Sequence, residues 1–280
     1  MKIIFIGGAT GTGKTDLAIK IHQMHNAYLI SCDSVQIYKN LDVGSNKSDR
    51  VDIHSLIDVA DFDEIFDVET YIKYVEEQLL YCEKNGLTPI IVGGTGFYMQ
   101  RLDTSRYDTL KIFLVCDRLV LYRKTDERCE KMIENGFLSE VLDLKNNGLS
   151  LNVIPGRAIG YRDAIIFLNK LTASKDIENH VHFNEFLHNF KRRTRNLIRS
   201  QETFFRKKEY IWIDINKFDP YSVIQLFLNK AVKFTEHFEF VNNISRDVNK
   251  NAFKKCKTYK PLDSKFTEKD INRILKNLEM

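Results

Sequence analysis

A glycine-rich loop near the N-terminus offers the clearest chemistry in the sequence. Residues 8–15 match the pattern GxxxxGK[ST] in full. In such a loop the backbone N–H groups wrap a phosphate, the lysine adds a positive charge, and the final hydroxyl is placed to bind Mg²⁺. We therefore expect a phosphate-binding loop, with Thr15 as a magnesium ligand, formed by Gly8, Thr10, Gly11, Thr12, Gly13, Lys14 and Thr15. The loop predicts a bound diphosphate or triphosphate without specifying the reaction. A glycine-rich turn without a ligand is the alternative interpretation.

Four further segments narrow the choice of reaction. They are SCDSVQIY at residues 31–38, continuing to LDVGSNK at 41–47, then HSLID at 54–58, GGTGFY at 93–98 and AIGYRD at 158–163. Together with the loop, they resemble the tRNA dimethylallyltransferase (isopentenyltransferase) family in order and approximate spacing. The resemblance runs from residue 3 to about residue 216. Each segment alone is a weak signal, whereas five in the same order are specific.

The resemblance implies a chemistry and a set of site residues. In that family the loop holds the pyrophosphate of dimethylallyl pyrophosphate together with Mg²⁺, and the exocyclic amine of adenine attacks the allylic carbon. Asp33 matches the general base of the family, and Thr95 matches a threonine beside the reaction channel. Residues 34–36, which are Ser34, Val35 and Gln36, match the segment that binds the target adenine. The alternatives are a magnesium-binding carboxylate or helix N-cap for Asp33, and a capping turn residue for Thr95.

A cationic helix is expected over residues 183–206. At 100° per residue its apolar side chains form one stripe, and Arg192, Arg195, Arg199 and Arg206 lie on the opposite side. A solvated basic face is the ordinary interpretation of such a pattern. By resemblance, Arg195 matches an arginine that contacts pyrophosphate. The chain departs from the family at Ser200, where a second arginine is usual, and at Lys124, which keeps the charge but not the bidentate fork of arginine.

The acceptor is less well specified than the reaction. Bacterial and eukaryotic tRNA enzymes of the family carry a helical insert after the GGTG motif, and here only residues 99–110 separate that motif from the next strand. Enzymes that prenylate free AMP, ADP or ATP also lack the insert, yet GTGFY is the tRNA type of motif. We therefore expect tRNA as the acceptor, with a free adenine nucleotide as the alternative. A P-loop small-molecule kinase and a non-catalytic RNA-binding relative are alternatives from other classes.

The elements that must position these residues follow from the hydrophobic pattern. Short apolar runs without strict alternation, separated by helices, indicate a buried parallel sheet. We expect strands at 2–6, 28–31, 89–92, 110–115 and 210–215, and helices at 14–25, 68–85, 118–135, 137–146 and about 178–208. The predicted fold is therefore α/β, a P-loop NTPase-like parallel sheet flanked by helices with a mostly helical C-terminal half. We expect one prenyltransferase domain over 1–234, its helical part at about 118–208, and a polar tail over 235–280. Residues 235–265 are expected to be irregular, followed by a terminal helix at 267–278.

Composition excludes several other classes of protein. Hydrophobic residues make up 43% and charged residues 29% of the 280 residues, which is ordinary for a globular protein. No apolar run approaches the roughly 20 residues that a membrane span needs. The five cysteines are scattered and lack CxxC spacing, which favours reduced thiols over a zinc site. We expect a cytoplasmic monomer without a signal or transit peptide, partnered by dimethylallyl pyrophosphate and the adenine acceptor but not by a membrane.

Overall fold

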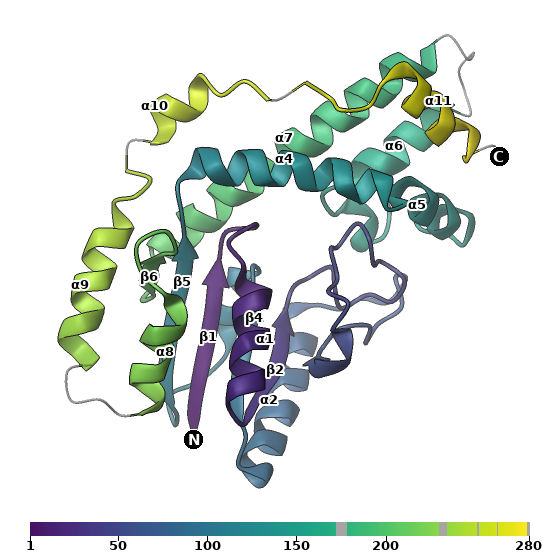
Figure 1. Cartoon of the computed structure of the whole chain (residues 1–280). Coiled ribbons are helices and arrows are strands. Elements are labelled where there is room, and N and C mark those ends of the chain that lie inside the picture. Colours follow the sequence, from purple (N-terminus) through teal and green to yellow (C-terminus); the bar gives the residue numbers. More distant parts are fainter. Residues whose placement is uncertain (172–177, 230–233, 251, 262, 279–280) are drawn as a thin grey trace.

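The computed structural model describes residues 1–171, 178–229, 234–250, 252–261 and 263–278. Its centre is a six-stranded sheet in which all neighbouring strands run parallel (Figure 1). The spatial order of the strands is β3-β2-β4-β1-β5-β6. The strands are β1 (Lys2–Gly8), β2 (Ala27–Cys32), β3 (His54–Ser55), β4 (Thr88–Gly93), β5 (Asp108–Val115) and β6 (Ile211–Asp214). Because they are parallel, the segments that follow β1, β2 and β4 all begin at one edge of the sheet.

Both faces of the sheet are covered, as the continuous apolar strands predict. Ile4 and Ile6 of β1 belong to a hydrophobic cluster with α1 (Lys14–Met24) and α8 (Pro220–Leu228). Ile3 and Phe5 point to the other face, where they join a cluster that includes α2 (Val68–Asn85). Successive side chains of a strand point to opposite faces, so the side chains of one short strand pack into two hydrophobic clusters.

The helical half lies over the carboxyl edge of the sheet, where α4 crosses above the strands (Figure 1). It comprises α4 (Arg118–Glu134), α5 (Phe137–Asn146), α6 (Tyr161–Leu171) and α7 (Asn179–Arg206). Phenylalanines from α5, α6 and α7 pack together, with ring centroids of Phe167 and Phe186 5.2 Å apart. Shorter elements complete this part: α3 (Gly96–Arg101) and the 3₁₀ turns Val51–Ile53 and Pro155–Arg157.

The sequence predictions for most elements are confirmed. The helix at 68–85, with Gly86 in a left-handed conformation as its stop, and the helix at 137–146 have the expected bounds. The five expected strands differ from the observed ones by at most two residues at an end. The two-residue strand β3 was not expected, because two residues are too few to show a period. The expected terminal helix is α11 (Glu268–Lys276), which Thr267 and Asp270 begin with a capping box.

The expectation of irregular structure over 235–265 is wrong for two stretches. Residues Phe234–Arg246 form α9, and Ala252–Lys257 form α10. α9 packs against the edge strand β6, with Phe238 and Val241 buried. The polar residues that make this segment look like a loop hold the edge of the sheet, because the N–H groups of Trp212 and Asp214 donate to Asn242 Oδ1 (2.9 Å) and Ser245 Oγ (2.8 Å). Side chains of α9 thus satisfy backbone donors that a sheet edge would otherwise expose.

Asn249, just beyond α9, fastens the tail to the domain. Its Oδ1 accepts the N–H of Arg118 (3.0 Å), and its Nδ2 donates to the carbonyl of Cys116 (3.0 Å) and to Glu202 Oε1 (2.7 Å). Glu202 also pairs with the Arg118 guanidinium. The side chains of Asn249, Arg118 and Glu202 are largely buried. The tail therefore completes a buried polar network between the end of β5, α4 and α7.

The sequence also predicted neither a membrane-spanning helix nor a zinc site. In the part of the chain that the structure describes, no helix combines the length and hydrophobicity that a membrane crossing requires. The cysteines are free thiols, and no group of three acidic, histidine or cysteine side chains among the described residues gathers as a metal site would.

We expect Asn249→Ala to lower the free energy of unfolding by about 2–4 kcal/mol, because it leaves buried polar groups without partners. Urea unfolding measures the change. The matched control is Asn243→Ala on the exposed side of α9, for which we expect a change below about 0.5 kcal/mol. Equal effects of the two substitutions would contradict the structural role of the Asn249 side chain.

Candidate active site

A cavity of about 1130 Å³ opens between the carboxyl edge of the sheet and the helices α4 and α7. The sequence motifs from distant parts of the chain meet there. Its lining includes the glycine loop from Thr10 to Thr15, the segment from Asp33 to Gln36, and Gly93, Gly94 and Thr95. Helix α4 contributes Lys124 and Arg128, and α7 contributes Thr194, Leu197 and Gln201. The structure thus gathers nearly all the site residues predicted from the sequence in one place.

The glycine loop has the backbone geometry that phosphate binding requires. Gly11 and Gly13 have φ values of 86° and 78°, which side chains disfavour. Thr12 Oγ1 and Lys14 Nζ both donate to the carbonyl of Ala9, at 2.7 and 3.0 Å, and so close the loop on itself. Helix α1 begins at Lys14, so its N-terminal N–H groups and dipole face the cavity. Gly8 ends β1 and lies behind the lining.

Two cations, Lys14 and Arg128, share this end of the cavity; neither forms a salt bridge with a described carboxylate, although Asp33 is near enough to interact electrostatically with both. Desolvation by the surrounding protein, followed by repulsion from Arg128, lowers the pKa of Lys14 to about 8. Desolvation also lowers the pKa of Arg128. Arg128 Nη2 donates to Thr10 Oγ1 (2.7 Å), but its buried Nε has no hydrogen-bond partner among the described residues. Such an arrangement favours an anion, which would offset both positive charges and supply the missing acceptor.

Asp33 lies at the end of β2, in the same lining as the glycine loop. Its Oδ1 accepts the N–H groups of Val35 (2.9 Å) and Gln36 (3.3 Å) and so shapes the turn that follows. The N-cap alternative is wrong, because a turn and not a helix follows Asp33, and the side chain lines the cavity. A single aspartate can both hold the turn and present its second oxygen to a ligand.

Thr95 is not a capping residue, although it immediately precedes α3. Its side chain makes no capping hydrogen bond. Instead, Thr95 Oγ1 accepts the N–H of Ser34 (3.1 Å) and lies 3.5 Å from Ser34 Oγ. Behind it, Gly93 leaves no room for a side chain, because a Cβ there would lie 1.9 Å from the carbonyl oxygen of Cys32. The close approach of β2 and β4 thus brings Thr95 and the Asp33 segment together.

Gln201 links two motifs, and the sequence analysis missed it. Its Oε1 accepts the N–H of Thr10 (2.9 Å), and its Nε2 donates to the carbonyl of Gly94 (3.3 Å). It is buried on α7, three residues after the buried Ile198. A polar residue at a buried position of an otherwise apolar stripe is the signal that would have indicated it.

Other motif residues of the cavity lining form hydrogen bonds and ion pairs within the wall itself. Lys47 Nζ donates to the carbonyl of Tyr38 (2.8 Å) and pairs with Asp42 (2.7 Å) and Asp58 (2.5 Å). Lys47 thus connects the motif at residues 31–47 to the HSLID segment. Gln36, expected to contact adenine, uses its Nε2 to donate to the carbonyl of Ser45 (3.1 Å) in the same wall. These bonds set the shape of the loop that encloses the cavity.

A carboxylate on α5 anchors the same loop from the other side. The oxygens of Glu140 accept the N–H groups of Asp42, Val43 and Gly44, at 2.6 to 3.1 Å. Tyr161 of the AIGYRD motif donates its hydroxyl to Glu140 (2.7 Å). Gly44 is pressed so closely against Phe137 that a Cβ would lie 2.2 Å from its ring. Tyr161 therefore supports the site indirectly, whereas Ala158 and Ile159 of the same motif line the cavity.

Arg195 does not line the cavity. It is 9% exposed and pairs with Asp126 of α4 (2.5 Å), and its guanidinium lies 5.4 Å from the ring centroid of Tyr259 in the tail. Arg199 and Ser200 are exposed and also lie outside the lining. The cation that the structure places against the glycine loop is Arg128, with Lys124 in the same lining. A pyrophosphate contact by Arg195 stays a prediction from the resemblance.

The chain matches a family model described as IPP transferase over residues 36–105 and 101–208. Among curated proteins, it is 30% identical to the tRNA dimethylallyltransferase of Oenococcus oeni, over 80% of this chain and 94% of that protein. It is 28% identical to the tRNA dimethylallyltransferase of Protochlamydia amoebophila, over 81% of this chain and 88% of that one.

Solved structures share the fold. A tRNA isopentenylpyrophosphate transferase of Staphylococcus epidermidis superposes with a TM-score of 0.71 at 22% identity, covering 82% of this chain and 99% of that one. A eukaryotic dimethylallyltransferase acting on tRNA gives a TM-score of 0.69 at 20% identity, covering 82% of this chain and 80% of that one.

The comparisons also bear on the connection between α3 and β5. The two segments that match the family model meet at residues 101–105. The alignment with the Protochlamydia protein spans 312 positions yet only 81% of this 280-residue chain, so that relative has residues that this chain lacks. Both facts agree with the short connection after the GGTG motif.

We expect Gln201→Met to weaken pyrophosphate binding by about tenfold, because it leaves the N–H of Thr10 and the carbonyl of Gly94 without their partner. Titration calorimetry with pyrophosphate and Mg²⁺ measures the effect. Gln23→Met on the exposed side of α1 is the matched control. An unchanged affinity in Gln201→Met would show that the loop holds its shape without this bridge.

Proposed function

The chain belongs to the IPP transferase family, and on that basis we propose that it transfers a dimethylallyl group from dimethylallyl pyrophosphate to N6 of an adenine in tRNA, next to the anticodon, releasing pyrophosphate. The curated relatives from Oenococcus and Protochlamydia both carry the name tRNA dimethylallyltransferase. The observation that carries the proposal for the site is the convergence of Lys14 and Arg128 on the glycine loop, opposite Asp33, in one cavity. The negative charge of a pyrophosphate ester would balance the positive charges of Lys14 and Arg128.

The reaction needs two things from the protein. Charge builds up on the leaving pyrophosphate, and in our proposal the N–H groups of the loop, Lys14 and Arg128 stabilise it. The attacking amine must lose a proton, and the carboxylate of Asp33 is the acceptor in our proposal. Because Oδ1 of Asp33 is occupied by the turn, Oδ2 is the atom that takes the proton. Thr95 and Ser34, bonded to each other beside it, form the wall that orients the adenine.

Magnesium is part of the proposal. The hydroxyl of Thr15 lines the cavity at the end of the glycine loop, and oxygen atoms of this kind are the ligands that Mg²⁺ prefers. Since the described residues contain no cluster of three candidate ligands, phosphate oxygens of the donor complete the set. When bound, the ion neutralises charge on the leaving group.

The acceptor is tested by supplying Mg²⁺ and labelled dimethylallyl pyrophosphate with unmodified tRNA, with AMP and with ATP in separate reactions. We expect label in tRNA only. Label in AMP or ATP only would make the protein an adenylate dimethylallyltransferase and overturn the proposed acceptor. Consumption of ATP with phosphate transfer and no prenyl transfer would instead indicate a small-molecule kinase.

We expect Asp33→Asn to reduce prenyl transfer by about 100-fold or more while leaving pyrophosphate affinity nearly unchanged. Asparagine keeps an oxygen that can accept the N–H groups of Val35 and Gln36, so the turn is preserved, but it cannot take the proton. Single-turnover rates and a separate pyrophosphate titration distinguish the two effects. Parallel loss of binding and rate would assign Asp33 to magnesium.

A further inference from the structure

A surface of aromatic rings and cations adjoins the cavity at α3 and the end of α7. We call it the platform and define it by Phe97, Arg101, Phe204, Lys207 and Lys208. Phe97 is 47% exposed although it lies only two residues from Thr95 in the cavity lining. The Arg101 guanidinium lies 5.2 Å from the centroid of the Phe97 ring. One helical turn of α3 thus presents a stacked ring and cation to solvent at the edge of the site.

The end of α7 repeats this pairing beside α3. Lys208 Nζ lies 5.4 Å from the centroid of the Phe204 ring. The Phe204 ring packs against Gly96, the first residue of α3, so closely that a Cβ there would lie 2.5 Å away. The two ring–cation pairs therefore belong to neighbouring helices that touch at Gly96.

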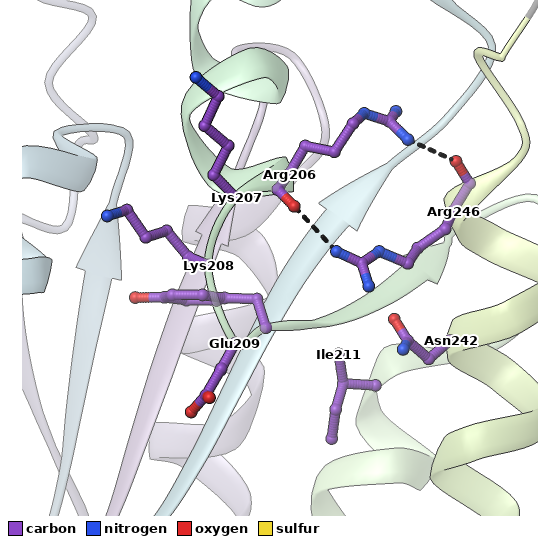
Figure 2. A pocket seen from close by; sticks show the side chains of 8 residues that line it. Arg206, Lys207, Lys208, Glu209, Ile211, Asn242 and Arg246 are labelled. Atoms are coloured by element: carbon purple, nitrogen blue, oxygen red, sulfur yellow. Dashed lines mark hydrogen bonds between the residues drawn. The ribbon is translucent and has the colours of Figure 1, made fainter.

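The platform continues into a shallow pocket of about 500 Å³ (Figure 2). Four cations line it, Arg206, Lys207, Lys208 and Arg246, against one acid, Glu209. The two arginines hold the backbone together, since Arg206 donates to the carbonyl of Arg246 (3.0 Å) and Arg246 donates to the carbonyl of Arg206 (2.9 Å). Each thereby caps the end of the other's helix, α7 or α9.

The lysines are not needed for that capping. Figure 2 shows Lys207 and Lys208 extending away from the arginine pair. Within the described part of the chain, neither lysine nor Arg101 forms an ion pair, so this face keeps an excess of positive charge. Only residues 102–107 connect α3 to β5, and Phe97 is half exposed beside this connection.

We propose that the platform binds single-stranded RNA, with Phe97 stacking on a base near the target adenine and Lys207 and Lys208 contacting backbone phosphates. Exposed aromatic rings next to cations are the chemistry by which proteins hold unpaired nucleotides. The position next to Thr95 places those nucleotides at the entrance of the cavity. This inference rests on the proposed function, since it assumes that the acceptor adenine belongs to an RNA.

The test measures steady-state prenyl transfer to tRNA by the full chain. We expect Phe97→Ala to raise KM for tRNA about 5- to 100-fold with little change in KM for dimethylallyl pyrophosphate. We expect Phe97→Tyr, which keeps an aromatic ring, to leave KM for tRNA at the wild-type value. Phe97→Leu should raise KM as Phe97→Ala does. That difference separates stacking on a base from a merely apolar contact. Thermal unfolding of the three variants checks that the half-exposed position leaves the fold intact.

The lysines are tested through salt dependence. We expect the double variant Lys207→Ala, Lys208→Ala to reduce the slope of log KM for tRNA against log salt concentration by about 1 to 2. The matched control is Lys73→Ala, Lys84→Ala on exposed positions of α2, for which the slope stays at the wild-type value.

The outcomes separate this inference from the proposed function. If the wild-type protein modifies tRNA but the platform variants keep its KM and salt slope, the platform is not an RNA-binding surface and the proposed function stands. If the wild-type protein prenylates only free nucleotides, the proposed acceptor and the platform both fail. An equal rise in KM for tRNA in the α2 control would also overturn the assignment.

Discussion

Two cations must be held near each other without a carboxylate between them, and much of the structure serves that requirement. Lys14 and Arg128 come from α1 and α4, and burial already lowers the pKa of each. Such an arrangement costs free energy in the absence of an anion, so the surroundings must prevent the side chains from turning away. The bonds of Lys14 to Ala9 and of Arg128 to Thr10 do this directly.

The same requirement explains why α7 carries a glutamine and buried ion pairs. Gln201 fixes the loop to the GGTG segment, while Arg195 and Asp126 join α7 to α4 on the side away from the cavity. Lys191 and Glu130 form a second buried pair of this kind. Because removing one partner of a buried pair is costly, these contacts keep the two helices in register over the site. The tail adds Tyr259, whose hydroxyl donates to Asp126 (2.9 Å).

The motifs that resemble a known family divide into two groups in space. The glycine loop, Asp33, Ser34 and Thr95 face the cavity. Lys47 pairs with Asp58, and Tyr161 donates to Glu140 of α5, which lies outside the motifs; these residues determine the shape of the wall. A motif residue can therefore be specific to a function because it holds a loop, without touching a ligand. This is why the resemblance indicated residues that meet in one cavity but did not indicate every residue of its wall.

The sequence by itself indicated five of the six strands, the helices α1, α2, α4, α5 and α7, the glycine loop and the family, because each depends on local patterns: apolar runs, glycine spacing and short motifs. It also revealed the short connection after GGTG. Only the tertiary structure decided which cations meet the loop. Arg195 and Arg128 are alike as sequence letters, yet helix packing turns one towards Asp126 and Tyr259 and the other towards Thr10. The tail shows the same limit. In the sequence, Asn242, Ser245 and Asn249 indicate a loop. In the structure, their side chains form hydrogen bonds with backbone groups of β6 and of the end of β5. Contacts between residues far apart in the chain leave no periodic signal, so they had to be seen in space.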